Sequence, residues 1–253
     1  MIKIHKEVYG QGKPIVLIHG WAMHTGIWRA FAQQLAQGYQ VTCLDLPGHG
    51  LSETVEPYAL EEVSAALAAA LPKSPVCLLG WSLGATVALA MAKNHPQQIN
   101  SLILLAGNPR FVQDGDWPGM NPQFLDDFSI NLSGNNQLML VQFLALQVNG
   151  LSNGKQILKD LKRVMAECDP PAESVLQNGL KILKNMDLRE CLVAVDCPIS
   201  LIHGDKDTLI PVQVSQKMKK IQPTCEISVI SGAGHVPFLS HESEVIEIIN
   251  QFV

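Results

Sequence analysis

The sequence predicts an α/β protein whose doubly wound, mostly parallel β-sheet is interrupted by a helical insertion. Short apolar runs alternate with amphipathic segments of helical periodicity, which is the order expected of strand–helix–strand units. Between residues 107 and 192 the strand-like runs disappear and only helical periodicity remains. The apolar runs then resume, so this block is best interpreted as an insertion that covers one end of the sheet.

The expected strands differ in how they are covered. Residues 3–9 alternate loosely and are typical of an edge strand that leads into a turn at residues 10–12. Residues 15–18 form a short continuous apolar run, which indicates a strand with both of its faces buried. Further strands are expected at residues 40–44, 75–79, 101–105, 199–203 and 226–230.

Helices are expected between these strands, where apolar residues recur at helical spacing. Trp28, Phe31 and Leu35 mark the first of them. Further helices are expected at residues 60–71, 85–94 and 211–221, and from about residue 242 to the end. The predicted domains are therefore a core of residues 1–106 and 193–253 and a helical lid of residues 107–192.

Composition narrows the function classes. Apolar residues make up 47% of the 253 residues and charged residues 16%, which is typical of a globular chain. The net charge of −5 argues against nucleic acid as a partner, because phosphate binding needs a basic surface. The six cysteines form no Cys-x-x-Cys pair and show no metal-binding spacing, and we favour a reduced, cytoplasmic protein over a disulfide framework. We expect a monomer.

Neither a membrane segment nor a cofactor is expected. The first residues carry charges where a signal peptide needs an apolar core. The uncharged stretch 74–92 is interrupted by proline and glycine, and a strand, a turn and a helix explain it better than a membrane span. No cluster of His, Asp and Glu has the spacing of a metal site, and no Gly-x-Gly-x-x-Gly follows a strand.

The chemistry is expected to centre on Ser82, in the sequence Gly-Trp-Ser-Leu-Gly at residues 80–84. A serine on a sharp turn between a strand and a helix presents its hydroxyl above the sheet, where a substrate carbonyl can reach it. The glycines allow the tight bend. Read alone, Ser82 could instead be a helix N-cap, and Trp81 could be either core or pocket wall.

Two later strand ends supply the partners that such a serine needs. The strand at 199–203 is followed by Asp205 and Asp207, and the strand at 226–230 is followed by His235. Active sites of parallel sheets lie at the carboxyl ends of the strands, and the order Ser, Asp, His is that of Gly-x-Ser-x-Gly hydrolases. His235 would be the base, and an acid would orient it. We favour Asp207 over Asp205, which could cap a turn.

Two backbone amides are candidates for stabilising the tetrahedral oxyanion. The N–H of Leu83 follows the nucleophile at a helix N-terminus, and the N–H of Trp21 lies just past the strand 15–18. Preorganised donors of this kind are each worth about 3 kcal/mol of activation barrier. His19 and Gly20 are expected to shape this loop without taking part in the chemistry.

Taken together with their neighbouring motifs, these residues make the chain resemble the α/β-hydrolase fold superfamily over its whole length. The motifs that carry the resemblance are His-Gly-Trp at 19–21, Asp-Leu-Pro-Gly-His-Gly at 45–50, the serine motif at 80–84, His-Gly-Asp-Lys-Asp at 203–207 and Gly-His at 234–235. Within the superfamily the chain is most similar to the pimeloyl-[acyl-carrier protein] methyl ester esterases of biotin synthesis. This similarity extends into the lid, at residues 108–111, 116–119, 143–147, 178–180 and 187–189.

The resemblance implies a carboxylesterase that removes the methyl group from pimeloyl-acyl-carrier protein methyl ester and also accepts small esters. It implies Ser82 as nucleophile, Asp207 as orienting acid, His235 as base, and Trp21 and Leu83 as oxyanion donors. It also implies substrate contacts from Trp21, Ser82, Leu83, His235 and a stretch that lines the acyl pocket, namely Phe143, Leu144, Ala145, Leu146 and Gln147.

Docking of an acidic carrier protein is implied through basic side chains of the lid. Lys155, Lys159, Lys162 and Arg163 share one face of a predicted helix whose apolar face carries Leu158, Leu161 and Met165. Such a stripe on an acidic protein suits an acidic partner, although a plain solvated face has the same pattern. Two earlier lid positions where the family would have arginines are Leu138 and Gln142.

Other functions fit parts of the same pattern. A hydrolase of C–C bonds or of aminoacrylate-type substrates would use the same triad. Haloalkane dehalogenase chemistry is disfavoured, because it needs a carboxylate where Ser82 stands. A non-catalytic module that binds carrier protein is a further alternative, against which the complete set of Ser82, Asp207 and His235 argues.

Overall fold

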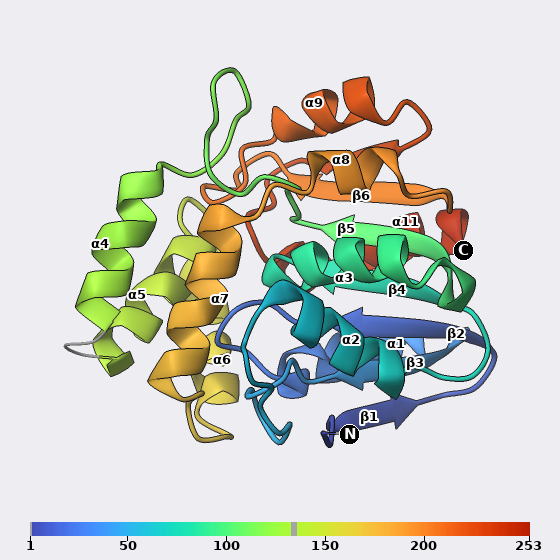
Figure 1. Cartoon of the computed structure of the whole chain (residues 1–253), viewed down its shortest axis with the longest axis horizontal. Coiled ribbons are helices and arrows are strands. Elements are labelled where there is room, and N and C mark those ends of the chain that lie inside the picture. The colour runs from blue at the N-terminus through green and yellow to red at the C-terminus, as the bar shows by residue number, and fades with distance from the viewer. Residues whose placement is uncertain (1, 133–135) are drawn as a thin grey trace.

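The computed structural model describes residues 2–132 and 136–253 (Figure 1). Within these described residues, seven strands form one sheet in the order β1-β3-β2-β4-β5-β6-β7. Only β1 runs antiparallel to its neighbour, and every other pair is parallel. The strands are β1 (Lys6–Tyr9), β2 (Lys13–Ile18), β3 (Tyr39–Leu44), β4 (Val76–Trp81), β5 (Ile99–Leu105), β6 (Ile199–Gly204) and β7 (Glu226–Ile230).

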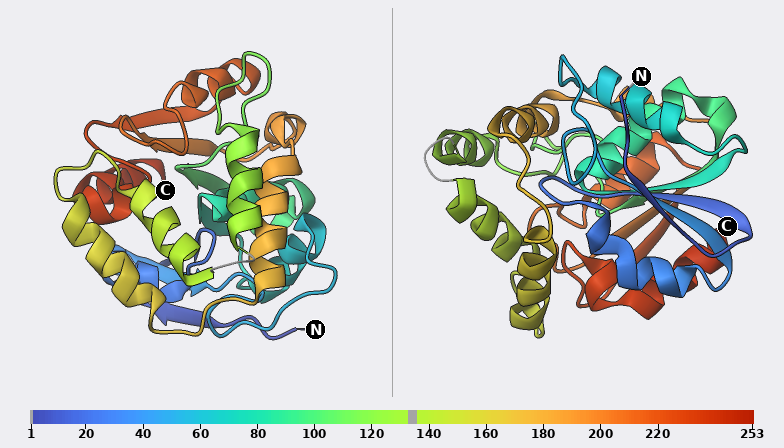
Figure 2. Two further views of the ribbon diagram at one scale, coloured as in Figure 1. Left: turned by 90° about the vertical axis from the view of Figure 1, so that its left-hand side faces the viewer. Right: turned by 90° about the horizontal axis from the view of Figure 1, so that it is seen from below.

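Helices cover both faces of this sheet, with α1 and α11 on one side and α2 and α3 on the other (Figure 2). The helical elements of the core are η1 (Thr25–Trp28), α1 (Arg29–Leu35), α2 (Leu60–Ala70), α3 (Leu83–Asn94), η2 (Pro96–Gln98), α9 (Val214–Ile221), α10 (Pro237–Ser240) and α11 (Glu242–Phe252). The predicted strands and long helices are thus confirmed to within a few residues. The short helices η1, η2 and α10 were not predicted.

The alternation of side chains explains why the central strands read as continuous apolar runs. In β2, Ile15 and Leu17 belong to one buried cluster, while Val16 and Ile18 belong to the cluster on the opposite face. Successive side chains of a strand point to opposite faces, and all of these are fully buried. A strand between two helical layers therefore needs an apolar residue at every position.

The remaining helices follow β5. They are α4 (Pro122–Leu132), α5 (Asn136–Gln147), α6 (Gly154–Met165), α7 (Glu173–Asn185) and α8 (Arg189–Val193). Helices α4 to α7 gather beyond the carboxyl ends of the parallel strands (Figure 1). The division into core and lid stays a prediction. Residues 133–135 of the predicted lid lie outside the described residues, and α8, at its far end, packs against α3 and α9.

No helix among the described residues is long and apolar enough to cross a membrane. Across those same residues, no group of three or more His, Cys, Asp or Glu side chains is placed to hold a metal ion.

Three buried histidines make stability depend on pH. Burial lowers the pKa of His19 and of His49 to about 3 and also lowers the pKa of His203. An unfolded histidine titrates near pH 6.5, so below that pH the unfolded chain binds more protons than the folded one. The stability that neutral histidines contribute is complete above pH 6.5, and it is lost as the pH falls toward 3.

We therefore expect His49→Asn to flatten this acid dependence. The imidazole Nδ1 donates to the carbonyl of Pro47 at 3.0 Å, and its Nε2 has no hydrogen-bond partner among the described residues, so the asparagine amide can keep the bond to Pro47. Urea unfolding between pH 6 and pH 4 should give a slope smaller by up to about 1.4 kcal/mol per pH unit, the contribution of one proton. Parallel curves for parent and variant would contradict the expectation.

Candidate active site

Ser82 lies on the turn between β4 and α3, in a backbone conformation that few non-glycine residues adopt. Its φ is 56° and its ψ is −117°, a strained combination of the kind found at functional sites. A Cβ at Gly80 would lie 2.2 Å from the carbonyl oxygen of Gly84, and a Cβ at Gly84 would lie 2.4 Å from that of Ile18. The two glycines of the motif are therefore required by close packing.

A continuous series of hydrogen bonds connects Ser82, His235 and Asp207. The Nε2 atom of His235 lies 2.8 Å from Oγ of Ser82, and its Nδ1 atom lies 2.8 Å from Oδ2 of Asp207. All three side chains are buried. Because a carboxylate can only accept, Nδ1 carries the proton and Nε2 is free to accept the serine hydrogen. The structure thus brings the predicted nucleophile, base and acid together.

The two aspartates that follow β6 have different partners. The Oδ1 atom of Asp207 accepts from the amides of Leu209 and Ile210 at 2.8 and 2.9 Å, which leaves Oδ2 aimed at the imidazole. Asp205 is exposed and accepts from the amide of Gly232 at 2.7 Å. Asp205 therefore caps the turn that precedes the histidine loop, and Asp207 is the carboxylate that contacts the imidazole.

The backbone of His235 is held on both sides. Its carbonyl accepts from the indole nitrogen of Trp81 at 2.7 Å, and its amide donates to the carbonyl of Gln147 at 3.3 Å. Trp81 is itself buried against Trp28 and Phe238, so it belongs to the core. A core position was one of the two expectations for Trp81, whereas its hydrogen bond to the backbone of His235 was not predicted, although its place beside the nucleophile was the available signal.

The candidate oxyanion donors are Leu83, which directly follows the serine, and Trp21, which follows Gly20 in the loop after β2. Leu83 is the first residue of α3, and amides of a first helical turn have no acceptor within the helix. Among the hydrogen bonds of residues 2–132 and 136–253, none uses the amide of Trp21. The loop before it approaches the nucleophile closely, because a Cβ at Gly20 would lie 3.2 Å from Cβ of Ser82.

Trp21 joins this loop to the helices beyond the sheet. Its ring packs edge-on against Phe143 of α5 at 4.9 Å and against Phe128 of α4 at 5.8 Å. Its indole nitrogen donates to the carbonyl of Leu176, in α7, at 2.9 Å. The predicted acyl-pocket stretch therefore begins, at Phe143, in contact with the side chain of Trp21, a candidate oxyanion donor.

The rest of that stretch is divided between the interior and the surface. Leu144 and Gln147 are buried, Leu146 is half-buried and Ala145 is exposed. Ala145 and Leu146 line a cavity of about 400 Å³ between α4 and α5, to which Phe128 also contributes. Both polar atoms of the Gln147 side chain are buried without a hydrogen-bond partner among the described residues.

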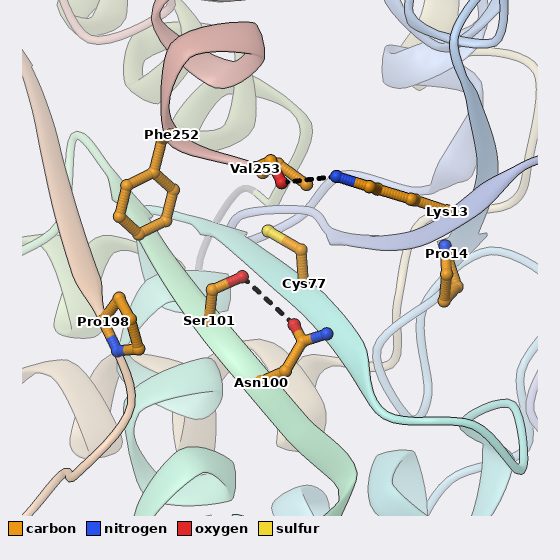
Figure 3. A pocket seen from close by; sticks show the side chains of 8 residues that line it. All are labelled: Lys13, Pro14, Cys77, Asn100, Ser101, Pro198, Phe252 and Val253. Carbon is orange, nitrogen blue, oxygen red and sulfur yellow. Dashed lines mark hydrogen bonds between the residues drawn. The ribbon is translucent and has the colours of Figure 1, made fainter.

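A second cavity, of about 410 Å³, lies away from this chemistry (Figure 3). Its lining includes Lys13, Cys77 and Ser101, which stand at or near the amino ends of β2, β4 and β5, opposite the serine turn. Its polar groups satisfy one another, since Lys13 donates to the carbonyl of Val253 and Ser101 to the side chain of Asn100. This cavity is not part of the candidate site.

The predicted basic stripe lies on α6. Lys155, Lys159, Lys162 and Arg163 are all exposed, and Arg163 lies 3.5 Å from Asp160 of the same helix. The opposite face is buried through Ile157, Leu161 and Val164. Leu161 was predicted on this face, whereas the predicted Leu158 and Met165 are only half-buried at its margins.

Comparison with known proteins identifies the family. The family model described as the alpha/beta hydrolase fold matches residues 13–242. The pimeloyl-[acyl-carrier protein] methyl ester esterase of Methylococcus capsulatus is 37% identical over 247 residues, covering 98% of this chain and 97% of that protein. The protein of the same name from Nitrosomonas europaea is 37% identical over 248 residues, covering 97% and 98%.

Solved structures agree on the fold. An esterase from Exiguobacterium antarcticum superposes with a TM-score of 0.89 at 23% identity, over 99% of this chain and 95% of that one. The chain therefore belongs to the α/β-hydrolase fold and, within it, to the family of pimeloyl-[acyl-carrier protein] methyl ester esterases, which are carboxylic ester hydrolases.

Proposed function

We propose that this protein hydrolyses the methyl ester of a pimeloyl group carried on acyl-carrier protein, through an acyl-enzyme on Ser82. The observation that carries the proposal is the unbroken series from Oγ of Ser82 through the imidazole of His235 to the carboxylate of Asp207. Membership of the esterase family supports the substrate. Small esters would react by the same route.

The first half of the reaction forms the acyl-enzyme. The Oγ atom of Ser82 attacks the ester carbonyl carbon while Nε2 of His235 takes the hydroxyl proton. Asp207 stabilises the imidazolium that results. The carbonyl oxygen becomes an oxyanion, and the amides of Trp21 and Leu83 would donate to it. Collapse breaks the bond to the methoxy group, which takes the proton from His235 and leaves as methanol.

The second half releases the acid. His235 takes a proton from a water molecule, whose oxygen attacks the carbonyl carbon of the acyl-enzyme. The second tetrahedral intermediate collapses when the proton returns to Oγ of Ser82. The products are the free serine and a pimeloyl chain that ends in a carboxylic acid, still attached to its carrier.

The position of the ester implies a long binding site. A pimeloyl group is attached to its carrier at one end and carries the methyl ester at the other, so the chain must span from Ser82 to the protein surface. The cavity between α4 and α5 is mainly apolar and includes two residues of the predicted acyl stretch, Ala145 and Leu146. The side-chain amide of Gln147 is buried and has no hydrogen-bond partner within residues 2–132 and 136–253, and we expect it to hydrogen-bond to bound substrate.

The proposal is tested by incubating purified protein with methyl-pimeloyl-carrier protein. Release of methanol, together with loss of one CH₂ unit from the mass of the loaded carrier protein, is the expected result. Methyl pimelate without the carrier should react with a lower kcat/KM, and dienoate substrates of C–C hydrolases should not react. Faster turnover of the dienoates than of the ester would overturn the proposal.

The exposed stripe on α6 is the proposed docking surface for the carrier protein. Lys155, Lys159 and Lys162 follow one another at spacings of four and three residues along the helix and face solvent. The protein as a whole carries a net charge of −5, so an acidic partner would be repelled elsewhere and attracted here. Complementary charge of this kind acts mainly on the rate of association.

We expect the double substitution Lys155→Glu and Lys159→Glu to lower kcat/KM for methyl-pimeloyl-carrier protein by about tenfold, through KM, at low ionic strength. Turnover of p-nitrophenyl acetate should not change, because that ester needs no docking. Lys73→Glu with Lys93→Glu serves as the control, because it makes the same change of charge at exposed positions outside the predicted lid. Equal effects of the two double variants would refute the docking surface.

The compartment and the assembly state are also proposed. All six cysteines are free, which suits a reducing cytoplasm, and we propose that the enzyme acts there as a monomer. Size-exclusion chromatography coupled to light scattering tests the second point.

A further inference from the structure

His19 is a fully buried side chain that the proposed reaction does not use. It follows directly after β2, and its imidazole lies between its own loop and the loop that follows β3. Its Nδ1 atom lies 2.8 Å from the carbonyl oxygen of Gly20, and its Nε2 atom lies 2.9 Å from the amide nitrogen of Leu46. Both nitrogens of the imidazole are therefore engaged by backbone groups.

These two partners decide which nitrogen carries the proton. The amide of Leu46 can only donate, so Nε2 accepts, and in a neutral imidazole the proton is then on Nδ1. Burial keeps the ring neutral by lowering its pKa to about 3. Asp45 lies 3.8 Å from Nε2, but its two oxygens accept from the amides of Thr25 and Leu51. The Nδ1–H of His19 consequently donates to Gly20.

The carbonyl that receives this hydrogen bond belongs to the peptide whose N–H is that of Trp21. In a planar trans peptide the C=O and the N–H point in opposite directions, so fixing the oxygen also fixes the direction of the N–H. The same oxygen accepts from the amide of Met23 at 3.3 Å. Between these residues Ala22 has a φ of 60°, a conformation that an alanine keeps only when its surroundings hold it.

We propose that His19 is a positioning residue for catalysis, which holds the Gly20–Trp21 peptide so that the Trp21 N–H faces the oxyanion. The inference rests on the proposed function, because it assigns Trp21 the role of oxyanion donor. His19 does not touch the substrate in this account. Its effect is confined to the transition state and the tetrahedral intermediates, where the negative charge develops.

Two amide substitutions separate the two hydrogen bonds. In His19→Asn the side-chain NH₂ takes the place of Nδ1 and can still donate to Gly20. In His19→Gln the amide takes the place of Nε2 and can still accept from Leu46, but Gly20 loses its donor. We expect His19→Gln to lower kcat for p-nitrophenyl acetate by about 10- to 100-fold with little change in KM, since complete loss of one oxyanion donor costs about 10²–10³-fold. His19→Asn should restore most of this loss.

Inhibition by an oxyanion analogue gives a second measurement. Its inhibition constant would not follow kcat/KM if His19 had only a structural role. An alkyl trifluoromethyl ketone adds Ser82 reversibly and forms a tetrahedral oxyanion. Its inhibition constant should rise in His19→Gln by the same factor by which kcat/KM falls, as expected of a transition-state analogue. His49→Gln and His49→Asn are matched controls, because His49 is equally buried beside His19, with ring centroids 5.5 Å apart, and should leave kcat unchanged.

The outcomes distinguish the two proposals. An inactive parent enzyme, or a parent whose activity does not need Ser82, overturns the proposed function and the role of His19 together. An active, Ser82-dependent parent in which the two His19 variants lose activity equally, in step with their melting temperatures, overturns the role of His19 alone. Should both variants fail to fold, the ¹⁵N chemical shifts of His19 in the parent decide, since a proton on Nε2 would exclude the proposed hydrogen bond.

Discussion

Replacement of Ser82 by alanine is expected to lower kcat for methyl-pimeloyl-carrier protein and for p-nitrophenyl acetate by at least about 10⁴-fold. Removal of a serine nucleophile from a triad costs up to about 10⁶-fold, because no other group can form the acyl-enzyme. KM should change little, since the hydroxyl is not needed to bind the ester. Single-turnover kinetics with p-nitrophenyl acetate measure the loss directly, as the absence of an acylation burst.

Stability measurements show whether this loss is chemical. Alanine at position 82 inherits the backbone conformation with φ of 56°, so Ser82→Ala should unfold at nearly the same temperature as the parent. Ser82→Gly relieves the strain, which is about 1 kcal/mol or more for such a residue, and should raise the melting temperature by roughly 2–4 °C. A variant that melts normally and still turns over substrate would disprove the acyl-enzyme.

The sheet and its order of elements could be predicted because the physical signal is local. Strands covered on both faces need apolar residues throughout, as the two faces of β2 demonstrate with Ile15 and Val16. The site could be predicted for a related reason: in a parallel sheet the carboxyl ends of the strands meet at one edge. Residues that follow β4, β6 and β7 were therefore expected to lie close together, however far apart they are in the chain.

What the sequence could not supply depends on contacts between distant segments. Nothing local reveals that the indole of Trp81 donates to the carbonyl of His235, or that the last turn of α5 accepts from the amide of His235 and the hydroxyl of Thr208. Through these bonds one helix of the predicted lid contacts both the acid loop and the base loop. Their geometry is set by how α5 packs on the core, which no periodicity encodes.

The choice between Asp205 and Asp207 is of the same kind. Both lie in the turn after β6, two residues apart, and either spacing is compatible with an acid in the triad. The structure separates them because the amides of Leu209 and Ile210 orient Asp207, while Gly232 engages Asp205. The difference is made by the backbone of each loop and not by the residue types.

Replacement of Asp207 by asparagine should therefore lower kcat by about 10⁴-fold. The asparagine oxygen can keep the hydrogen bonds from Leu209 and Ile210, and this orientation turns the NH₂ group toward Nδ1 of His235. The imidazole must then accept at Nδ1 and carry its proton on Nε2, where it can no longer take the proton of Ser82. Steady-state kinetics with p-nitrophenyl acetate measure the loss, and a normal melting temperature shows that the loop is intact.

Asp205→Asn is the matched control, because it makes the same chemical change two residues away. Asparagine retains an oxygen that can accept from the amide of Gly232, so activity should stay within about threefold of the parent, as expected for a group that only caps a turn. A larger loss from Asp205→Asn than from Asp207→Asn would show that Asp205, and not Asp207, is the acid of the triad. With the expected order, the hydrogen bond from Nδ1 to Oδ2 of Asp207 is the one that fixes the tautomer of His235, and the tautomer is what makes Ser82 a nucleophile.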